Sequence, residues 1–195
     1  MFLPTRLRAQ ALALFLGVAC VYAAFSPFAI AHMGYASETM RACRQLLSPE
    51  RPRVPPDFGV DWPRNGSTEV VLQCGFQAVG RAIGGPDSVW EHRLAAMQPV
   101  LATAALVTVV FVWASRLASS RRKAFWLALA AGFCTMLWPY AYIGMEPIQS
   151  LFLLLAGYFA LETPPEPSWK RTAAFSLCGA VAVASKSGGA ASSAP

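Results

Sequence analysis

Two apolar runs that flank a short polar segment constrain the fold of this chain more than any other feature. Residues 124–142 and 147–161 are strongly apolar, and the polar segment from Tyr140 to Pro147 contains one carboxylate, Glu146. Such runs are typical of helices in lipid, so together they predict a transmembrane hairpin. An ionisable side chain near the membrane is costly, which makes Glu146 a functional-site candidate. Its position before Pro147 also suits a simple helix cap.

The composition indicates a membrane protein. Hydrophobic residues make up 55% of the chain and charged residues 13%, whereas a soluble domain carries about a quarter charged residues. The net charge of +6 does not indicate nucleic-acid binding, because the basic residues are dispersed in short segments beside the apolar runs. In such positions they set the orientation of the spans and contact anionic headgroups. The predicted partner is therefore membrane lipid.

Five apolar segments predict an all-α transmembrane fold with about five membrane helices. They are residues 9–31, 99–114, 124–142, 147–161 and 172–184. With the N-terminus in the cytoplasm, the basic loops 116–123 and 162–171 are cytoplasmic as well, as the positive-inside rule requires. Residues 32–98 and the segment that contains Glu146 then share the outer side. A cleaved signal peptide is the alternative for the first segment, and it leaves the same loop outside.

We expect one membrane domain over residues 1–195. Its parts are a first span (1–31), an outer loop (32–98), further spans (99–184) and a flexible tail (185–195). The outer loop is expected to be partly helical. An amphipathic helix is expected at 34–47 and a Pro-rich stretch at 49–66. A helix over 67–84 follows, capped by Ser67 or Thr68 and ended by glycine, and Asp87 or Ser88 is expected to begin another helix.

Two of the five cysteines, Cys43 and Cys74, fall in the outer loop. In an oxidising compartment this pair is a disulfide candidate. The sequence leaves the bridge open, because it does not show whether the two backbones approach closely enough.

The chain lacks the motifs of soluble enzymes. It has no P-loop and no HExxH motif, and His32 and His92 have no ligand cluster around them, so no zinc site and no cofactor are predicted. A requirement for a divalent metal stays open. The remaining chemistry lies in the carboxylates of the outer side. Proton transfer at a membrane surface favours a shielded carboxylate with a raised pKa, and Glu38 and Glu146 fit that need best.

Residues 135–161, TMLWPYAYIGMEPIQSLFLLLAGYFAL, resemble a segment of polytopic GT-C glycosyltransferases. The nearest likeness is to the bacterial branch related to protein mannosyltransferases and lipid A sugar transferases. Residues 67–84 also resemble the helix that leads back to the membrane in this family. The resemblance implies the N-terminal portion of a longer transferase in a bacterial inner membrane.

The resemblance also implies a reaction. A sugar would move from a polyprenyl-phosphate donor to an acceptor hydroxyl on the outer face, with an outer carboxylate as general base. Glu38 is the first candidate for the base and Glu146 the second catalytic candidate. The candidates for substrate binding, including stabilisation of the leaving phosphate, are Arg41, Arg44, Tyr140 and Lys186.

Simpler roles stand beside these assignments. Glu38 suits the polar face of an interfacial helix, Arg41 and Arg44 suit lipid headgroups, Tyr140 suits an aromatic belt, and Lys186 suits the end of a span. A non-catalytic truncated protein or subunit is therefore the alternative function. A transporter with Glu146 on a proton path is disfavoured, because the other spans contain no charged residue.

Overall fold

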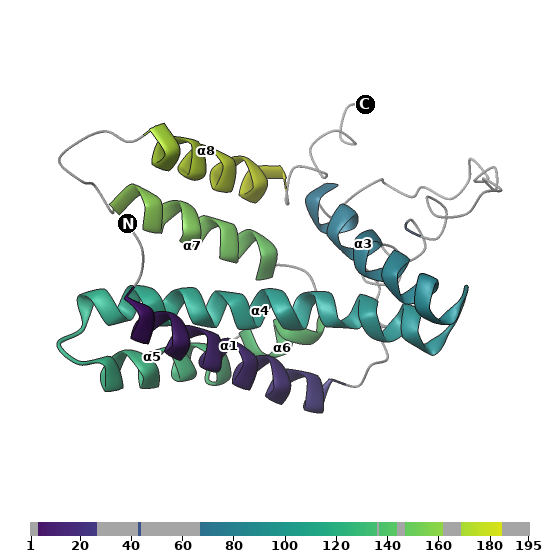
Figure 1. The fold of residues 1–195 in the computed structure, drawn as a ribbon, viewed down its shortest axis with the longest axis horizontal. Coiled ribbons are helices and arrows are strands. Elements are labelled where there is room, and N and C mark those ends of the chain that lie inside the picture. Colours follow the sequence, from purple (N-terminus) through teal and green to yellow (C-terminus); the bar gives the residue numbers. More distant parts are fainter. Residues whose placement is uncertain are drawn as a thin grey trace, which may run out of the picture.

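The computed structural model describes residues 4–26, 43, 67–135, 137–143, 147–161 and 169–184, and all regular elements in these ranges are helices (Figure 1). The predicted all-α class is therefore confirmed for this part of the chain. The helices are α1 (Thr5–Phe25), α3 (Ser67–Gly84), α4 (Val89–Leu117), α5 (Arg121–Phe133), α6 (Leu137–Ile143), α7 (Pro147–Leu161) and α8 (Trp169–Ala184).

The longest helix, α4, is the centre of the molecule. Its 29 residues extend about 43 Å, the thickness of a bilayer with its headgroups. It contacts α1, α3, α5, α6 and α7, while α8 packs on α7. In Figure 1, α1, α5 and α6 lie on one side of α4, and α7 and α8 lie on the other. The architecture is a bundle of roughly parallel and antiparallel helices, with α3 folded back over the start of α4.

The main core lies between α1, α4 and α5. One face of α1 supplies Leu14, Val18 and Tyr22, which are buried against α4 residues such as Val107. Alanines complete the contacts and let the backbones approach closely: Ala104, Ala124 and Ala128 are fully buried. The core is therefore built from one face of α1, whose buried residues recur every three to four positions. This face packs against small side chains on the neighbouring helices.

A buried polar contact closes this core near the end of α1. The Tyr22 hydroxyl donates a hydrogen bond of 2.7 Å to the Gly132 carbonyl oxygen. A Cβ added at Gly132 would lie 2.8 Å from a Val107 methyl, so a larger residue would push α5 away from α4. Gly132 thus permits the close packing of α5 that brings its carbonyl oxygen to the Tyr22 hydroxyl.

Two of the described helices, α1 and α4, are long and apolar enough to cross a membrane. The expectation of about five spans is not confirmed. The helices α5, α7 and α8 have 13, 15 and 16 residues, fewer than the roughly 20 that cross a bilayer.

The predicted third segment, 124–142, is wrong as a single helix, because the structure divides it into α5 and α6. The cause is Pro139, which has no N–H for the carbonyl of Thr135 and whose ring would clash with that carbonyl in a continuous helix. When a new helix starts at Leu137, Pro139 falls in its first turn, where no intrahelical donor is needed.

Several other predicted boundaries also change. The second segment begins at Val89 rather than at residue 99, because Ser88 caps the helix and Pro99 lies inside it. The first helix covers Thr5–Phe25 rather than 9–31. The prediction for 67–84 is confirmed by α3, and the prediction for 147–161 by α7. The helix expected at 34–47 lies outside the described residues, except for Cys43.

Candidate functional site

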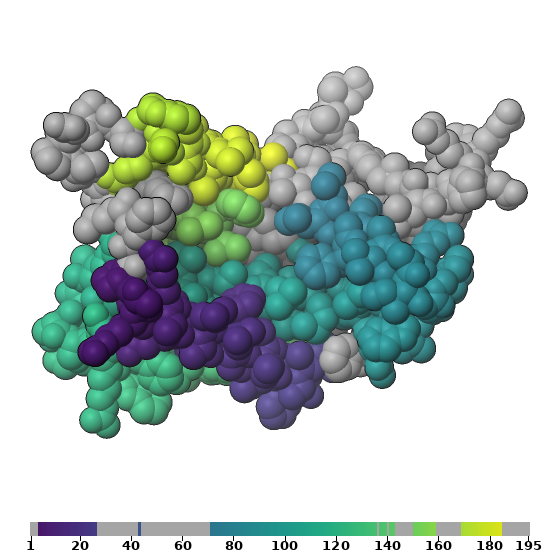
Figure 2. Space-filling model, viewed as in Figure 1, coloured from purple at the N-terminus to yellow at the C-terminus, as the bar shows by residue number. Residues whose placement is uncertain are grey.

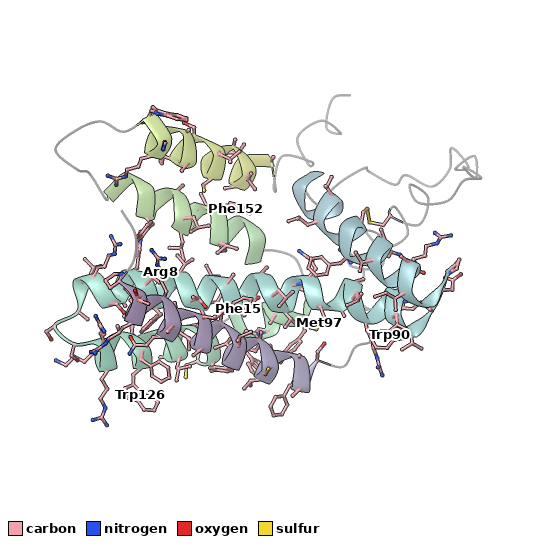
Figure 3. All side chains as sticks on the ribbon, in the orientation of Figure 1. Arg8, Phe15, Trp90, Met97, Trp126 and Phe152 are labelled. Atoms are coloured by element: carbon pink, nitrogen blue, oxygen red, sulfur yellow. A yellow bond between two sulfur atoms is a disulfide. The ribbon has the colours of Figure 1, made fainter. Side chains whose placement is uncertain are left out.

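The bundle has two ends of different charge (Figure 1). The helices α1, α5 and α8 begin, and α4 and α7 end, at one end. We call it the basic end, because it holds Arg6, Arg8, Arg116, Arg121, Arg122, Lys123, Lys170 and Arg171. The opposite end holds α3 and the start of α4, and we call it the hairpin end. The described carboxylates, Asp87 and Glu91, are both at the hairpin end, together with Arg81 and Arg93. Figure 3 labels Arg8 near one end and Trp90 near the other.

The structure describes few of the predicted site residues. Glu38, Arg41, Arg44, Glu146 and Lys186 lie outside the described residues. Tyr140 belongs to α6, but its side chain is not among those described.

The described helices do show where the segments with these residues are attached. The chain leaves α1 at Phe25, leaves α6 at Ile143, enters α7 at Pro147 and leaves α8 at Ala184, and each of these helix ends points away from the basic end (Figure 1). All the segments with predicted catalytic residues are therefore joined to the same side of the bundle.

A disulfide joins Cys43 to Cys74 of α3, with the two Cα atoms 5.0 Å apart. Along the chain, Cys43 lies two residues after Arg41 and one residue before Arg44. The bond therefore places Cys43 beside α3, whereas the neighbouring Arg41 and Arg44 lie outside the described residues.

A buried polar cluster holds α3 against α4. The Gln77 amide nitrogen donates a hydrogen bond of 2.7 Å to Glu91 Oε1, and the Asp87 backbone N–H donates one of 2.7 Å to Glu91 Oε2. The Ser88 hydroxyl oxygen accepts a bond of 3.2 Å from the Glu91 backbone N–H. Gln77 is 0% exposed and Glu91 1%. The Ser88 half of this arrangement is that of a capping box, but the Glu91 carboxylate accepts from Asp87, one residue before the N-cap, and it also reaches a second helix.

The same hairpin depends on two glycines. A Cβ at Gly80 would lie 2.5 Å from the Trp90 carbonyl oxygen, so only glycine permits this close crossing of α3 and α4. In the turn between the helices, Gly85 has a φ of 86° and Asp87 a φ of 57°, values in the left-handed region. The turn is thus short and its shape is fixed by residue type.

The polar and apolar faces of α3 are reversed relative to those of a helix in water. Its buried side contains Gln73 and Gln77, and its exposed side contains Val71, Val79 and Ile83. A helix on the surface of a water-soluble protein buries its apolar stripe instead. An outward apolar face is what a helix presents to lipid.

Two aromatic residues of α6, Trp138 and Tyr142, are engaged in packing. The ring of Trp138 lies 5.2 Å from that of Tyr22 and 5.6 Å from that of Tyr142, in edge-on arrangements. Phe133 of α5 completes the cluster. These rings stabilise the junction of α1, α5 and α6, so their contacts are with one another and not with an open stacking surface.

Sequence reasoning missed the buried polar residues of the hairpin. The available signal was the spacing Ser88-Val89-Trp90-Glu91, which is the pattern of a capping box. A second signal was the pair Gln73 and Gln77, four residues apart on one helix face. The partner of Gln77 was not readable, because it depends on how α3 folds back. Within the described ranges, no group of three His, Cys, Asp or Glu residues is placed to hold a metal ion.

No protein-family model, curated protein or solved structure matches this chain. The resemblance of residues 135–161 to GT-C transferases therefore stays a hypothesis.

Proposed function

We propose that the chain is a multi-pass protein of a bacterial inner membrane, with the basic end in the cytoplasm and the hairpin end on the outer face. Basic residues in short connections favour the cytoplasmic side, and the basic end gathers those of α1, α4, α5 and α8. The length of α4, about 43 Å, suits a helix that crosses the hydrocarbon core and continues through the headgroups. The outward apolar face of α3 then rests in the outer interface.

We propose further that the hairpin end carries out glycosyl transfer from a polyprenyl-phosphate donor. The observation that carries this proposal is that the segments with Glu38 and Glu146 are attached to helices on the same side of the bundle. On that side α1 ends at Phe25, α6 ends at Ile143 and α7 begins at Pro147. The disulfide between Cys43 and Cys74 of α3 supports it, because Cys43 lies only five residues after Glu38 in the chain.

In the proposed reaction an acceptor hydroxyl attacks the anomeric carbon of the donor sugar. Glu38 accepts the hydroxyl proton as the new C–O bond forms. The bond from the anomeric carbon to the phosphate oxygen breaks, and its electron pair leaves with the polyprenyl phosphate. Arg41 and Arg44 stabilise the phosphate charge that develops. Glu146, Tyr140 and Lys186 contact the substrates from the other segments at this end.

The test replaces the carboxylates without changing their size. Glu38→Gln and Glu146→Gln are made in the native-length protein, and Glu166→Gln, in the connection between α7 and α8, is the matched control. Membranes are incubated with polyprenyl phosphate that carries radiolabelled hexoses or pentoses, and label in the acceptor fraction is counted. We expect Glu38→Gln to lower transfer by about 10²- to 10⁴-fold, the usual contribution of a general base.

A different result identifies the alternative. Equal transfer by all three variants would overturn the assignment of Glu38 and Glu146. Absence of transfer by the unaltered protein with every donor would favour a non-catalytic membrane subunit.

A further inference from the structure

An apolar groove of about 740 Å³ lies between α1, α4 and α5. Its walls include Gly17 and Val21 of α1, Phe111 of α4, and Phe125 of α5. Figure 2 shows α1 at the surface of the molecule with α5 beside it. The groove is separate from the hairpin end and from all the residues assigned to glycosyl transfer.

The groove has the length of one membrane leaflet. It follows α1 from Gln10 to Val21, which is about 16 Å at 1.5 Å per residue. Half of a hydrocarbon core of about 30 Å is about 15 Å. In the proposed orientation of α1, the groove therefore runs from the cytoplasmic headgroups to the bilayer midplane.

The charge of the groove is confined to one end. Arg121 and Arg122, both exposed, line it at the basic end, and Gln10 is the polar residue of the opposite wall. The two arginines are the first residues of α5, directly after its N-cap Ser120. The positive end of the helix dipole adds to their charge, which favours an anion at this position.

An apolar groove as long as one leaflet, with two arginines at one end, is complementary to a lipid with an anionic headgroup. We propose that the groove binds an anionic phospholipid of the leaflet at the basic end, with an acyl chain along α1 and the phosphate at Arg121 and Arg122. The lipid-linked sugar donor is not the occupant, because its phosphate belongs at the hairpin end, about the 31 Å length of α1 away.

The headgroup preference is measured by native mass spectrometry. The full chain is released from micelles that contain equimolar phosphatidylglycerol and phosphatidylethanolamine, and the two bound populations are compared. We expect phosphatidylglycerol to be retained preferentially. Either Arg121→Gln or Arg122→Gln should lower that preference about fivefold, the factor that corresponds to about 1 kcal/mol for a basic residue at an anionic surface.

The charge control is the double variant Arg6→Gln/Lys170→Gln. It removes the same charge as Arg121→Gln/Arg122→Gln from the same end of the bundle, but neither residue lines the groove. We expect the control to keep the preference for phosphatidylglycerol. An equal loss in both double variants would mean that general surface charge attracts the lipid, and would overturn the site.

The acyl-chain position is tested by filling the groove. Gly17 lines the groove, and a Cβ added there meets nothing within 4 Å, so the larger side chain in Gly17→Leu is expected to extend into the groove. Gly179 of α8 also has open space around an added Cβ but does not line the groove, so Gly179→Leu is the matched control. We expect Gly17→Leu to abolish retention of either lipid while the unfolding temperatures of both variants stay equal.

Two results would overturn the proposal. One is equal retention of the two phospholipids by the unaltered chain, which would indicate unspecific boundary lipid. The other is unchanged lipid retention with an altered oligomeric state in Gly17→Leu, which would show that a protein helix occupies the groove.

Discussion

At the scale of single residues, the contact between Gln77 and Glu91 decides how α3 sits on α4. A buried carboxylate is costly unless hydrogen bonds satisfy its oxygens. Glu91 meets this requirement with a side-chain amide from α3 and a backbone N–H from the turn. Glu91 thus links the turn before its own helix to a second helix.

Replacing Gln77 by leucine should destabilise the hairpin. The substitution keeps the approximate volume but removes the donor to Glu91 Oε1, which leaves that oxygen buried without this bond. We expect the free energy of unfolding to fall by about 1–3 kcal/mol. Denaturant unfolding in detergent micelles measures the change. Val79→Ala on the exposed side of α3 is the control and should alter the stability by less than about 0.5 kcal/mol, whereas an equally small effect of Gln77→Leu would contradict the assigned role of the bond.

The crossing at Gly80 gives a second prediction at this scale. In Gly80→Ala, the new methyl would lie 2.5 Å from the Trp90 carbonyl oxygen, so α3 and α4 must separate. We expect a loss of about 1–3 kcal/mol, as for other overpacked sites. Gly75 lies in the same helix with open space around an added Cβ, so Gly75→Ala should gain up to about 1 kcal/mol from helix propensity. The same unfolding titration compares the pair, and stabilisation by both alanines would refute the close crossing.

At the scale of elements, two prolines in apolar segments have opposite outcomes. Pro99 lies inside α4, and the helix continues through it. Pro139 lies where one predicted helix divides into α5 and α6. Contacts with α3 on the first turns of α4 stabilise the helix on the N-terminal side of Pro99, despite the hydrogen bond that Ala95 loses. Before Pro139, α5 instead ends at Phe133 and the new helix α6 begins at Leu137.

The disulfide is the second feature at this scale, and its presence is directly measurable. Alkylation of the denatured, unreduced protein should modify the thiols of Cys20, Cys134 and Cys178, and prior reduction should add Cys43 and Cys74. Intact mass gives the number of modified thiols in each sample. Modification of all five without reduction would exclude the bridge.

Loss of the bridge should also lower stability. The disulfide joins residues 31 positions apart, and closing a loop of this size typically stabilises a protein by about 2–4 kcal/mol. We expect Cys74→Ser to reduce the free energy of unfolding by about that amount. The control, Cys134→Ser, changes an exposed free cysteine and should have little effect. Equal stabilities would mean that the loop is held by other contacts.

At the scale of the whole molecule, the fold gathers basic residues at one end of the bundle. The basic residues at the start of α1, at the junction of α4 and α5, and at the start of α8 come from three separate stretches of the sequence, and the fold brings them to one end (Figure 1). The resulting asymmetry is the arrangement that the positive-inside rule associates with the cytoplasmic face.

Reporter fusions test this orientation. Alkaline phosphatase, which is active only outside the cytoplasm, should be active when fused after Pro86, in the turn between α3 and α4. It should be inactive when fused after Ser119, between α4 and α5. The reverse pattern would invert the topology, and activity at both sites would show that α4 does not cross the membrane.

The sequence by itself determined the all-α class of the described residues and the bounds of α3 and α7, because hydropathy, a proline at a helix start and glycines at a helix end act locally. It also supplied the two outer-loop cysteines and the candidates Glu38 and Glu146. Only the tertiary structure decided that α4 runs through Pro99, that Cys43 reaches Cys74, and that Gln77 satisfies Glu91. The apolar groove likewise depends on how α1 and α5 both pack on α4. These features arise between segments distant in sequence, and local preference carries no information on which surfaces will meet.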